Sequence, residues 1–198
     1  MTEGSTTVVP RTGPALGLIE VASVARGMVV ADAMVKKALI TLVQANPVTP
    51  GKYVVVIAGG EEEVSQSMDI GLELASDTLV DSLYLPKADS QLAPAIATQQ
   101  VQVDEVQALG ILETFSVASC VLAGDRAVKG AMVQLVQMRL ARGLGGKAFF
   151  VLTGQLHQVE AGVEAGRGII HDGMLPTSEI IPRPHADFVR AVLSQGVY

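Results

Sequence analysis

The sequence has a single cysteine, Cys120, and no tryptophan among its 198 residues. One cysteine can form neither a disulfide within the chain nor a cysteine-rich metal site, which favours a reducing, intracellular environment. Aromatic residues make up only 4%, which argues against the aromatic platforms on which single-stranded nucleic acids stack. The formal net charge of −6 supplies no basic field for a phosphate backbone. We therefore expect no nucleic-acid partner.

Long apolar runs are also missing. No stretch approaches the about 20 apolar residues that span a bilayer, and the N-terminal segment contains no apolar core of signal-peptide length. We expect no membrane association, and a flexible tail over residues 1–13. The chain is nevertheless 49% hydrophobic and only 17% charged, with a mean hydropathy of +0.41. These values predict a packed aliphatic core together with extensive contacts between subunits.

The most informative feature is an internal repeat. The segment Ala15–Glu20 recurs 93 residues later as Ala108–Glu113, and 13 of the 29 positions from 15 to 43 are identical at that spacing. Further along, Gly51-Lys52 matches Gly146-Lys147 at a spacing of 95 residues. A period of about 90 residues is too long for a solenoid repeat. The chain therefore consists of two copies of one small domain.

The joint between the copies lies in a polar, glutamine-rich stretch that includes residues 98–102. Length alone, at about 150 residues per domain, allows one domain or two small ones, and the repeat decides for two. We place the first domain at residues 14–97, a linker at 98–107 and the second domain at 108–198.

Hydrophobic patterning predicts the order of elements within each unit. Val24, Met28 and Val35 recur at helical spacing after Ser23, which fits an N-cap. The expected elements of the first unit are a strand at 16–21, a helix at 24–38, a strand at 40–44, a loop at 46–51, a strand at 53–58, a helix at 62–76 and a strand at 79–85. This order predicts an α/β fold of the ferredoxin-like α+β type, with an antiparallel sheet and helices on one face. The second unit repeats it and adds an amphipathic segment at 186–193.

Residues that could carry catalysis form no recognised arrangement. The segment Gly143–Lys147 looks like a phosphate-binding loop, but it lacks both the earlier glycine and the hydroxyl residue after the lysine. His157, His171 and His185 are 14 residues apart, which is not a metal-ligand spacing, so we interpret them as surface or loop residues. We predict neither an enzyme nor a metal site.

Three further residues with reactive side chains also have structural interpretations. Glu20 and Glu113 end repeat-related apolar strands. We interpret them as carboxylates that accept backbone donors rather than as an acid–base pair. Cys120 lies within the expected first helix of the second unit, where a small buried apolar residue is the usual role of a free cysteine.

Two acid–lysine pairs stand at equivalent helix positions. Asp32 precedes Lys36 by four residues, and Asp125 precedes Lys129 in the same way. Each pair can be an ordinary helix-face ion pair, worth about 0.2–0.5 kcal/mol. Each can instead place its lysine on the rim of the domain, against a neighbouring protein. The repetition supports both interpretations equally.

The two loops between the expected second and third strands differ in composition. Asn46–Gly51 is rich in proline and therefore stiff, whereas Ala141–Gly146 is rich in glycine and lets the backbone approach another surface. From the residues alone, both can be ordinary hairpin loops or functional ones.

Several segments, in order along nearly the whole chain, resemble the shell domain of bacterial microcompartments. They are the strands Ala15–Glu20 and Ala108–Glu113, the helix segments Ala33–Ala38 and Gly124–Gly130, and Ile181–His185 near the C-terminus. Two such domains in tandem and in unpermuted order are similar to the tandem-domain shell proteins of the propanediol-utilisation type, which form trimers.

The resemblance implies that three chains form a ring of six domains. Such tiles join each other and hexameric and pentameric shell proteins around encapsulated enzymes in the bacterial cytoplasm. The resemblance places Lys36, Lys129, Arg183 and Pro184 at the tile edges. In the first unit Pro86-Lys87-Ala88 stands where the family has Pro-Arg-Pro-His, which is a departure from the pattern.

The same resemblance places the loop between the second and third strands at a central pore. The pore-lining residues are then Val48, Thr49 and Pro50 from the first unit, and Gly143, Leu144 and Gly145 from the second. In some relatives a cysteine stands immediately before Pro-Gly-Lys, and three thiolates hold an iron–sulphur cluster. This chain has Thr49 there, and a hydroxyl is a poor ligand for such iron. We therefore expect no cofactor and a pore for small polar or anionic metabolites.

A second hypothesis rests on the fold alone. Small ferredoxin-like domains often assemble as trimers and bind metabolites between subunits, so the chain can also be a ligand-binding or signalling module. Such a module would stay a discrete oligomer, whereas a shell tile would form flat sheets or join hexameric partners.

Overall fold

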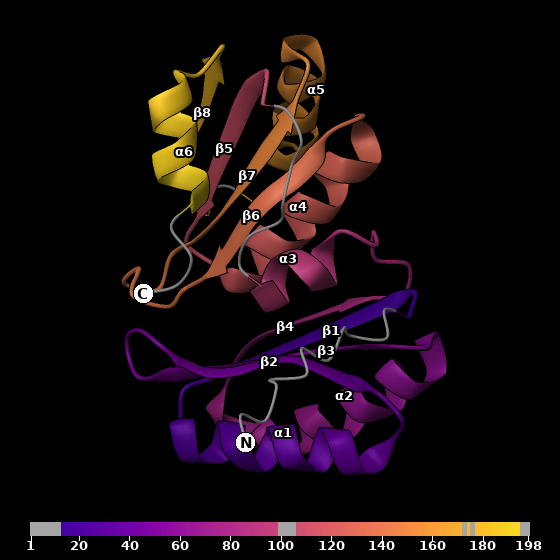
Figure 1. Ribbon diagram of the computed structural model, residues 1–198. Coiled ribbons are helices and arrows are strands. Elements are labelled where there is room, and N and C mark those ends of the chain that lie inside the picture. The colour runs from indigo at the N-terminus through magenta and orange to yellow at the C-terminus, as the bar shows by residue number, and fades with distance from the viewer. Residues whose placement is uncertain (1–12, 99–105, 172–173, 175–176, 195–198) are drawn as a thin grey trace, which may run out of the picture.

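The computed structural model describes residues 13–98, 106–171, 174 and 177–194, and it contains two copies of one four-stranded domain (Figure 1). The first copy consists of β1 (Ala15–Val21), α1 (Val24–Lys37), β2 (Thr41–Val48), β3 (Lys52–Gly59), α2 (Glu61–Ala75), η1 (Ser76–Thr78) and β4 (Leu79–Leu85), followed by α3 (Leu92–Thr98). The second consists of β5 (Ala108–Thr114), α4 (Val117–Gly130), β6 (Gln134–Leu140), β7 (Ala148–Gly154), α5 (Leu156–Arg167), β8 (Thr177–Pro182) and α6 (Ala186–Ser194). Most of the expected tail, residues 1–12, and residues 99–105 of the expected linker lie outside the described residues.

Both sheets are antiparallel and share one strand order, β2-β3-β1-β4 in the first domain and β6-β7-β5-β8 in the second. The register is shared as well. Leu16 of β1 pairs with Ala58 of β3, and the repeat-equivalent Leu109 of β5 pairs with Thr153 of β7. The edge strands β2 and β6 each carry a register shift at the same place. The duplicated β-α-β-β-α-β fold predicted from the sequence is confirmed.

Helix starts follow the predicted capping. Ser23 precedes α1 and accepts a hydrogen bond on its hydroxyl oxygen from the Arg26 N–H at 3.2 Å. Ser116 precedes α4 and accepts one from the Ser119 N–H, also at 3.2 Å. Each side chain thereby satisfies one of the backbone donors that a helix start leaves unpaired.

Strand β2 is longer than predicted. The prolines at 47 and 50 predict a loop from residue 46, whereas β2 continues through Pro47 to Val48, and only residues 49–51 form the turn. β2 lies at the edge of its sheet. An edge strand tolerates a residue without an N–H group, because the outward-facing backbone positions need no partner within the sheet.

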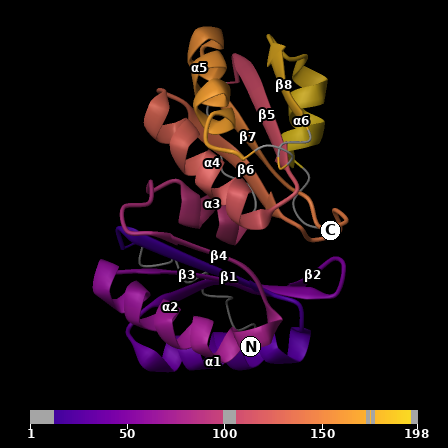
Figure 2. The same ribbon diagram turned by 180° about the vertical axis from the view of Figure 1, so that it is seen from behind.

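Helix α3 is the element that the sequence pattern did not indicate. Its seven residues are fewer than an isolated helix needs to be stable. Tertiary packing holds it in place, since Leu92, Ala93, Ala95 and Ile96 are all buried. This helix lies between the first sheet and the second domain (Figures 1 and 2).

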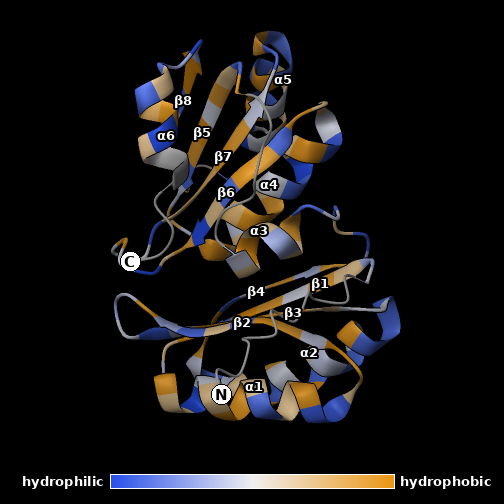
Figure 3. Ribbon diagram, viewed as in Figure 1, coloured by the Kyte–Doolittle hydropathy of each residue, from blue (hydrophilic) through white to orange (hydrophobic). Residues whose placement is uncertain are grey.

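The core forms two main parts. One part fills the space between the first sheet and helices α1 and α2, with Ile19, Met34 and Ile57 among its members. The other is continuous from the opposite face of that sheet, through α3, into the space between the second sheet and its helices. Figure 3 shows the apolar central strands on which these layers pack. The prediction of helices on one face holds for α1 and α2, but α3 and the second domain cover the other face.

At one buried contact between the first helix and the third strand, the two units have the larger side chain on opposite elements. In the first, a Cβ atom at Gly27 would lie 2.4 Å from the Cβ of Tyr53, so only glycine fits beneath that ring. The equivalent positions of the second unit hold Cys120 and Ala148. In the first unit the strand carries the larger residue and the helix the smaller one, and in the second unit this is reversed.

Gly27→Cys should lower the free energy of unfolding by about 1–3 kcal/mol, because the added side chain overpacks a buried site. Chemical denaturation measures the change. The matched control is Gly27→Cys combined with Tyr53→Ala, which transfers the pair of the second unit and should restore part of the loss. A double variant less stable than both single variants would contradict this packing account.

Candidate functional site

The two loops predicted to line a pore lie side by side, although they are far apart in the sequence. The turn at residues 49–51 and the loop at residues 141–147 extend on the same side of the molecule (Figure 1). A Cβ atom at Gly146 would lie 3.6 Å from the Thr49 carbonyl oxygen and 3.7 Å from Pro50 Cδ. The fold therefore brings the repeat-related loops together into one cluster, which we call the loop cluster.

The predicted pore residues differ in what they offer to solvent. Thr49, Pro50, Gly143 and Gly145 are exposed, and Leu144 is half-buried. The side chain of Val48 is 4% exposed and belongs to the shared core. Val48 therefore packs inward, and the solvent-facing part of the turn begins at Thr49.

Glycine gives the loop cluster its backbone shape. Gly51, Gly143, Gly145 and Gly146 have φ angles of 74°, 71°, 61° and 91°, values that side chains with a Cβ rarely adopt. Residues 49–51 and 141–146 contain one charged side chain, that of Arg142, and it is exposed. Its surface therefore combines a hydroxyl, a proline ring, exposed backbone and one cationic group.

A lysine at the base of each loop pairs with the glutamate of the neighbouring strand. Lys52 Nζ donates to Glu20 Oε1 at 2.9 Å, and Lys147 Nζ donates to Glu113 Oε1 at 3.2 Å. The glutamates were expected to accept backbone donors, so the structure corrects their partner while keeping their structural role. Lys52 is the first residue of β3 and Lys147 immediately precedes β7, both distant in sequence from their glutamates, which is why the local pattern did not reveal the pairs. The pairs fix the strands from which the loops extend.

The loop cluster does not fit an iron–sulphur cluster. Such clusters are held by thiolates, and the loop residue at the relevant position is Thr49. The thiol of the chain belongs to Cys120, which is fully buried in α4. Burial raises the pKa of this thiol to about 12, and a hydrogen bond with Thr114 opposes that rise. Cys120 thus stays protonated within the core.

A second cluster joins the two domains. The side chain of Asp125 in α4 is buried, and its carboxylate accepts hydrogen bonds from Lys129 Nζ at 2.7 Å and from the Asp89 N–H at 2.8 Å. The same ammonium group donates to the carbonyl oxygen of Lys87. One carboxylate and one ammonium group of the second domain thereby hold the segment that follows β4 in the first.

A further contact between the two domains lies at the start of α4. The Ser116 hydroxyl donates to Asp81 Oδ2 of β4 at 2.8 Å, in addition to capping its own helix. We call this set the intrachain seam, and it joins residues 81, 87 and 89 of the first domain to residues 116, 125 and 129 of the second.

The repeat counterparts of the seam residues on α1 are exposed. Asp32 and Lys36 correspond to Asp125 and Lys129, and they bond to each other at 2.5 Å. Their side chains are 60% and 72% exposed, against 4% and 39% for the equivalent pair in α4. The sequence left open whether each pair is an ordinary surface pair or a contact with a neighbouring protein. In this structure the first pair is exposed, and the second contacts the other domain of the same chain.

The counterparts of Lys87 and Asp89 lie at the other end of the chain. Strand register relates Leu85 to Ile181, because they pair with the repeat-equivalent residues of β1 and β5. The segment that follows β4 therefore corresponds to the segment that follows β8, with Arg183 at the place of Lys87 and His185 at the place of Asp89. Both are exposed.

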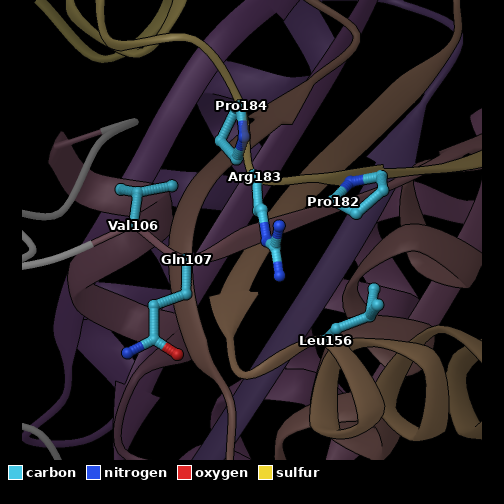
Figure 4. A pocket seen from close by; sticks show the side chains of 6 residues that line it. All are labelled: Val106, Gln107, Leu156, Pro182, Arg183 and Pro184. Carbon is cyan, nitrogen blue, oxygen red and sulfur yellow. The ribbon is translucent and has the colours of Figure 1, made fainter.

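The predicted edge residues Arg183 and Pro184 lie at a surface pocket of about 470 Å³ (Figure 4). The Arg183 N–H donates to the Gln107 carbonyl oxygen at 3.0 Å, which anchors the turn. The remaining lining residues are Val106, Leu156 and Pro182. Lys36 and Arg183 are exposed and Pro184 is half-buried, whereas Lys129 is shared with the intrachain seam. Their role at a tile edge remains a prediction.

Two exposed apolar residues were missed by the sequence analysis. Leu39 and Met132 are 82% and 80% exposed, and they occupy equivalent positions just beyond α1 and α4. Each borders a small hollow beside its own edge strand. The available signal was a large apolar residue repeated immediately after a helix end, where polar residues are the rule.

Groups that could support catalysis are not assembled in the described part of the chain. His157, His171 and His185 are exposed and separate, as expected for surface residues. Among the described residues, no group of three or more His, Cys, Asp or Glu side chains could hold a metal ion. Within the same residues, every buried polar side-chain atom has a hydrogen-bond partner, and no helix is long and apolar enough to cross a membrane.

Comparison with known proteins identifies both halves of the chain. The family model described as the BMC domain matches residues 15–88 and again residues 108–184. The chain is 40% identical over 180 residues to the bacterial microcompartment shell protein PduT of Citrobacter freundii, covering 90% of this chain and 97% of that one. It is 32% identical over 93 residues to the shell protein PduA of the same organism, covering 46% of this chain and 96% of that one.

Solved structures give a consistent result. A crystal structure of a microcompartment protein from Desulfitobacterium hafniense DCB superimposes with a TM-score of 0.85 at 42% identity, covering 89% of this chain and 98% of that one. A fused permuted shell protein of the RMM microcompartment has a TM-score of 0.55 at 21% identity, covering 77% and 81%. The second likeness concerns the fold alone.

Proposed function

Since this chain belongs to the BMC-domain family and is a bacterial microcompartment shell protein, we propose that three copies of it close a ring of six domains that forms one tile of a shell. Its relatives are structural shell proteins, so the chain is not an enzyme. We propose three features of this assembly: the ring of six domains, its central pore, and its tiling into a shell.

The intrachain seam is the main observation that supports the proposed ring. It is a heterologous contact, because the segment after β4 of one domain meets helix α4 of the next. A heterologous contact that repeats by a fixed rotation generates a closed ring or an open filament. The chain carries an unused half of this contact at each end, on α1 and after β8. Three chains joined through these halves give six equivalent joints.

The loop cluster supplies the pore of the proposed tile. Both of its loops lie on one side of the chain (Figure 1), so rotation about an axis on that side brings three copies of each together. The exposed Thr49 hydroxyls, the glycine backbone and Arg142 favour small polar or anionic metabolites over apolar ones. No cofactor is part of this proposal.

The outer edges of the tile meet other shell proteins. PduA and EutM, to which the chain is similar, are microcompartment shell proteins, and we propose hexameric and pentameric tiles as partners within the bacterial cytoplasm. Lys36, Lys129, Arg183 and Pro184 are the proposed edge residues. Since Lys36 and Arg183 also belong to the unused halves of the joint, we place them where each joint between domains reaches the outer edge of the tile. The exposed Leu39 and Met132 add apolar area there, because burying such surface favours association.

Light scattering and electron microscopy test the proposal together. Three chains of 20.6 kDa should give a species of about 62 kDa that forms flat sheets at higher concentration. A monomer at all concentrations would overturn the ring. A discrete trimer that forms no sheets alone or with hexameric shell proteins, and that binds a metabolite tightly, would favour the ligand-binding module instead.

A further inference from the structure

We propose that helix α6 docks on a second copy of this chain, against its edge strand β2, as α3 docks on β6 within one chain. The inference rests on the proposed ring and adds a contact beyond the intrachain seam. The partner surface is the first domain of the next protomer.

Helix α6 is the repeat counterpart of α3. The register that relates Leu85 to Ile181 continues along the chain and relates residues 92–98 to residues 188–194. Both helices follow the last strand of their domain. Each lies on the sheet face opposite the two longer helices of its domain (Figure 1).

The apolar positions of the two helices coincide. The buried positions of α3 include Leu92, Ala93 and Ala95, and the corresponding residues of α6 are Phe188, Val189 and Ala191. Phe188 is nevertheless 42% exposed in the single chain, whereas Leu92 is fully buried. Helix α6 therefore carries the same apolar face as α3 without the domain that covers it.

The residue before α3 hydrogen-bonds to the backbone of the edge strand on which the helix docks. Gln91 Oε1 accepts a hydrogen bond from the Leu135 N–H at 2.8 Å, and Gln91 Nε2 donates to the Val133 carbonyl oxygen at 3.4 Å. The side-chain amide thus pairs with the backbone at the start of β6. This contact sets the position of α3 along the strand.

The equivalent receiving site lies at the start of β2. The counterparts of Val133 and Leu135 are Ile40 and Leu42, and Leu42 is 42% exposed. The counterpart of Gln91 is Asp187, whose carboxylate can accept from the Leu42 N–H but cannot donate to the Ile40 carbonyl. In the single chain this carboxylate bonds to Arg190 of its own helix, so docking requires it to share or exchange that partner.

A cysteine pair tests the contact in the full-length protein. Thr41→Cys and Asp187→Cys in one chain should be joined between protomers by a short bismaleimide. A denaturing gel should then show a covalent trimer. Cys120 does not compete, because it is buried. The matched control is Gln91→Cys with Gln134→Cys, which should consume its thiols within one chain and leave the monomer mass unchanged.

The outcomes separate the two proposals. Absence of a trimer by light scattering would overturn the ring and with it this contact. A trimer in which the 41/187 pair gives no more covalent product than a Glu73→Cys/Asp187→Cys pair would overturn the docking of α6 alone. Phe188→Asp supplies a second measurement. It should raise the dissociation constant of the trimer at least tenfold, and an unchanged constant would contradict the proposal.

Discussion

Asp125→Ala should lower the free energy of unfolding by about 3 kcal/mol, because it removes two hydrogen bonds to a buried charged group and leaves a part-buried backbone N–H unsatisfied. Asp125 is 3% exposed and accepts from both Lys129 and the Asp89 N–H. The substitution would leave that N–H without its partner at the intrachain seam. Chemical denaturation at a concentration where the chain is monomeric measures the loss.

The matched control is Asp32→Ala at the equivalent position of α1. Its carboxylate belongs to an exposed pair, so the stability of the isolated chain should change by less than about 0.5 kcal/mol. In the proposed ring the same carboxylate becomes part of the joint between chains. A similar loss of about 3 kcal/mol there corresponds to a dissociation constant raised about 100-fold, which light scattering on dilution would reveal. A full loss of stability for Asp125→Ala together with an unchanged dissociation constant for Asp32→Ala would refute the equivalence of the two joints.

Thr49→Cys should give the protein an iron–sulphur cluster that we expect the wild-type protein not to hold. In the proposed ring, rotation about the axis brings three copies of residue 49 together, and thiolates are the usual ligands of such clusters. After anaerobic reconstitution with iron and sulphide, the wild-type protein should stay colourless. The variant should gain absorption near 400 nm, at about one cluster per three chains.

Glu73→Cys provides the control for nonspecific iron binding, since it adds the same number of thiols on the exposed face of α2. Absorption in the wild-type protein would disprove the argument from Thr49. A colourless Thr49→Cys trimer would show that the loop cluster does not surround the axis.

Much of the fold could be predicted because its signals are local and occur twice. Helical spacing after Ser23 and the β-branched run before Gly59 each indicate one element, and the second copy repeats the order. The exceptions have tertiary causes. Strand β2 runs through Pro47 because it is an edge strand, and α3 is helical because its apolar face is buried between domains.

The candidate site was only partly visible in the sequence. The family resemblance predicted which loops line a pore. That role stays a prediction, while the structure brings those two loops together. The sequence did not indicate that Val48 packs inward or that Lys52 pairs with Glu20. Both facts depend on how neighbouring strands align, and no local pattern encodes that alignment.

The sequence by itself determined that this protein is one domain written twice, with equivalent residues at Asp32 and Asp125 and at Lys36 and Lys129. It could not distinguish the members of these pairs, because the same residues at the same spacing give the same local structure. Tertiary structure decided that Asp125 lies in a joint and Asp32 lies in solvent. The physical reason is that a single chain of two domains contains one joint between them, so only one of the two equivalent carboxylates can lie in it. In the proposed ring, other chains fill the matching halves at its ends.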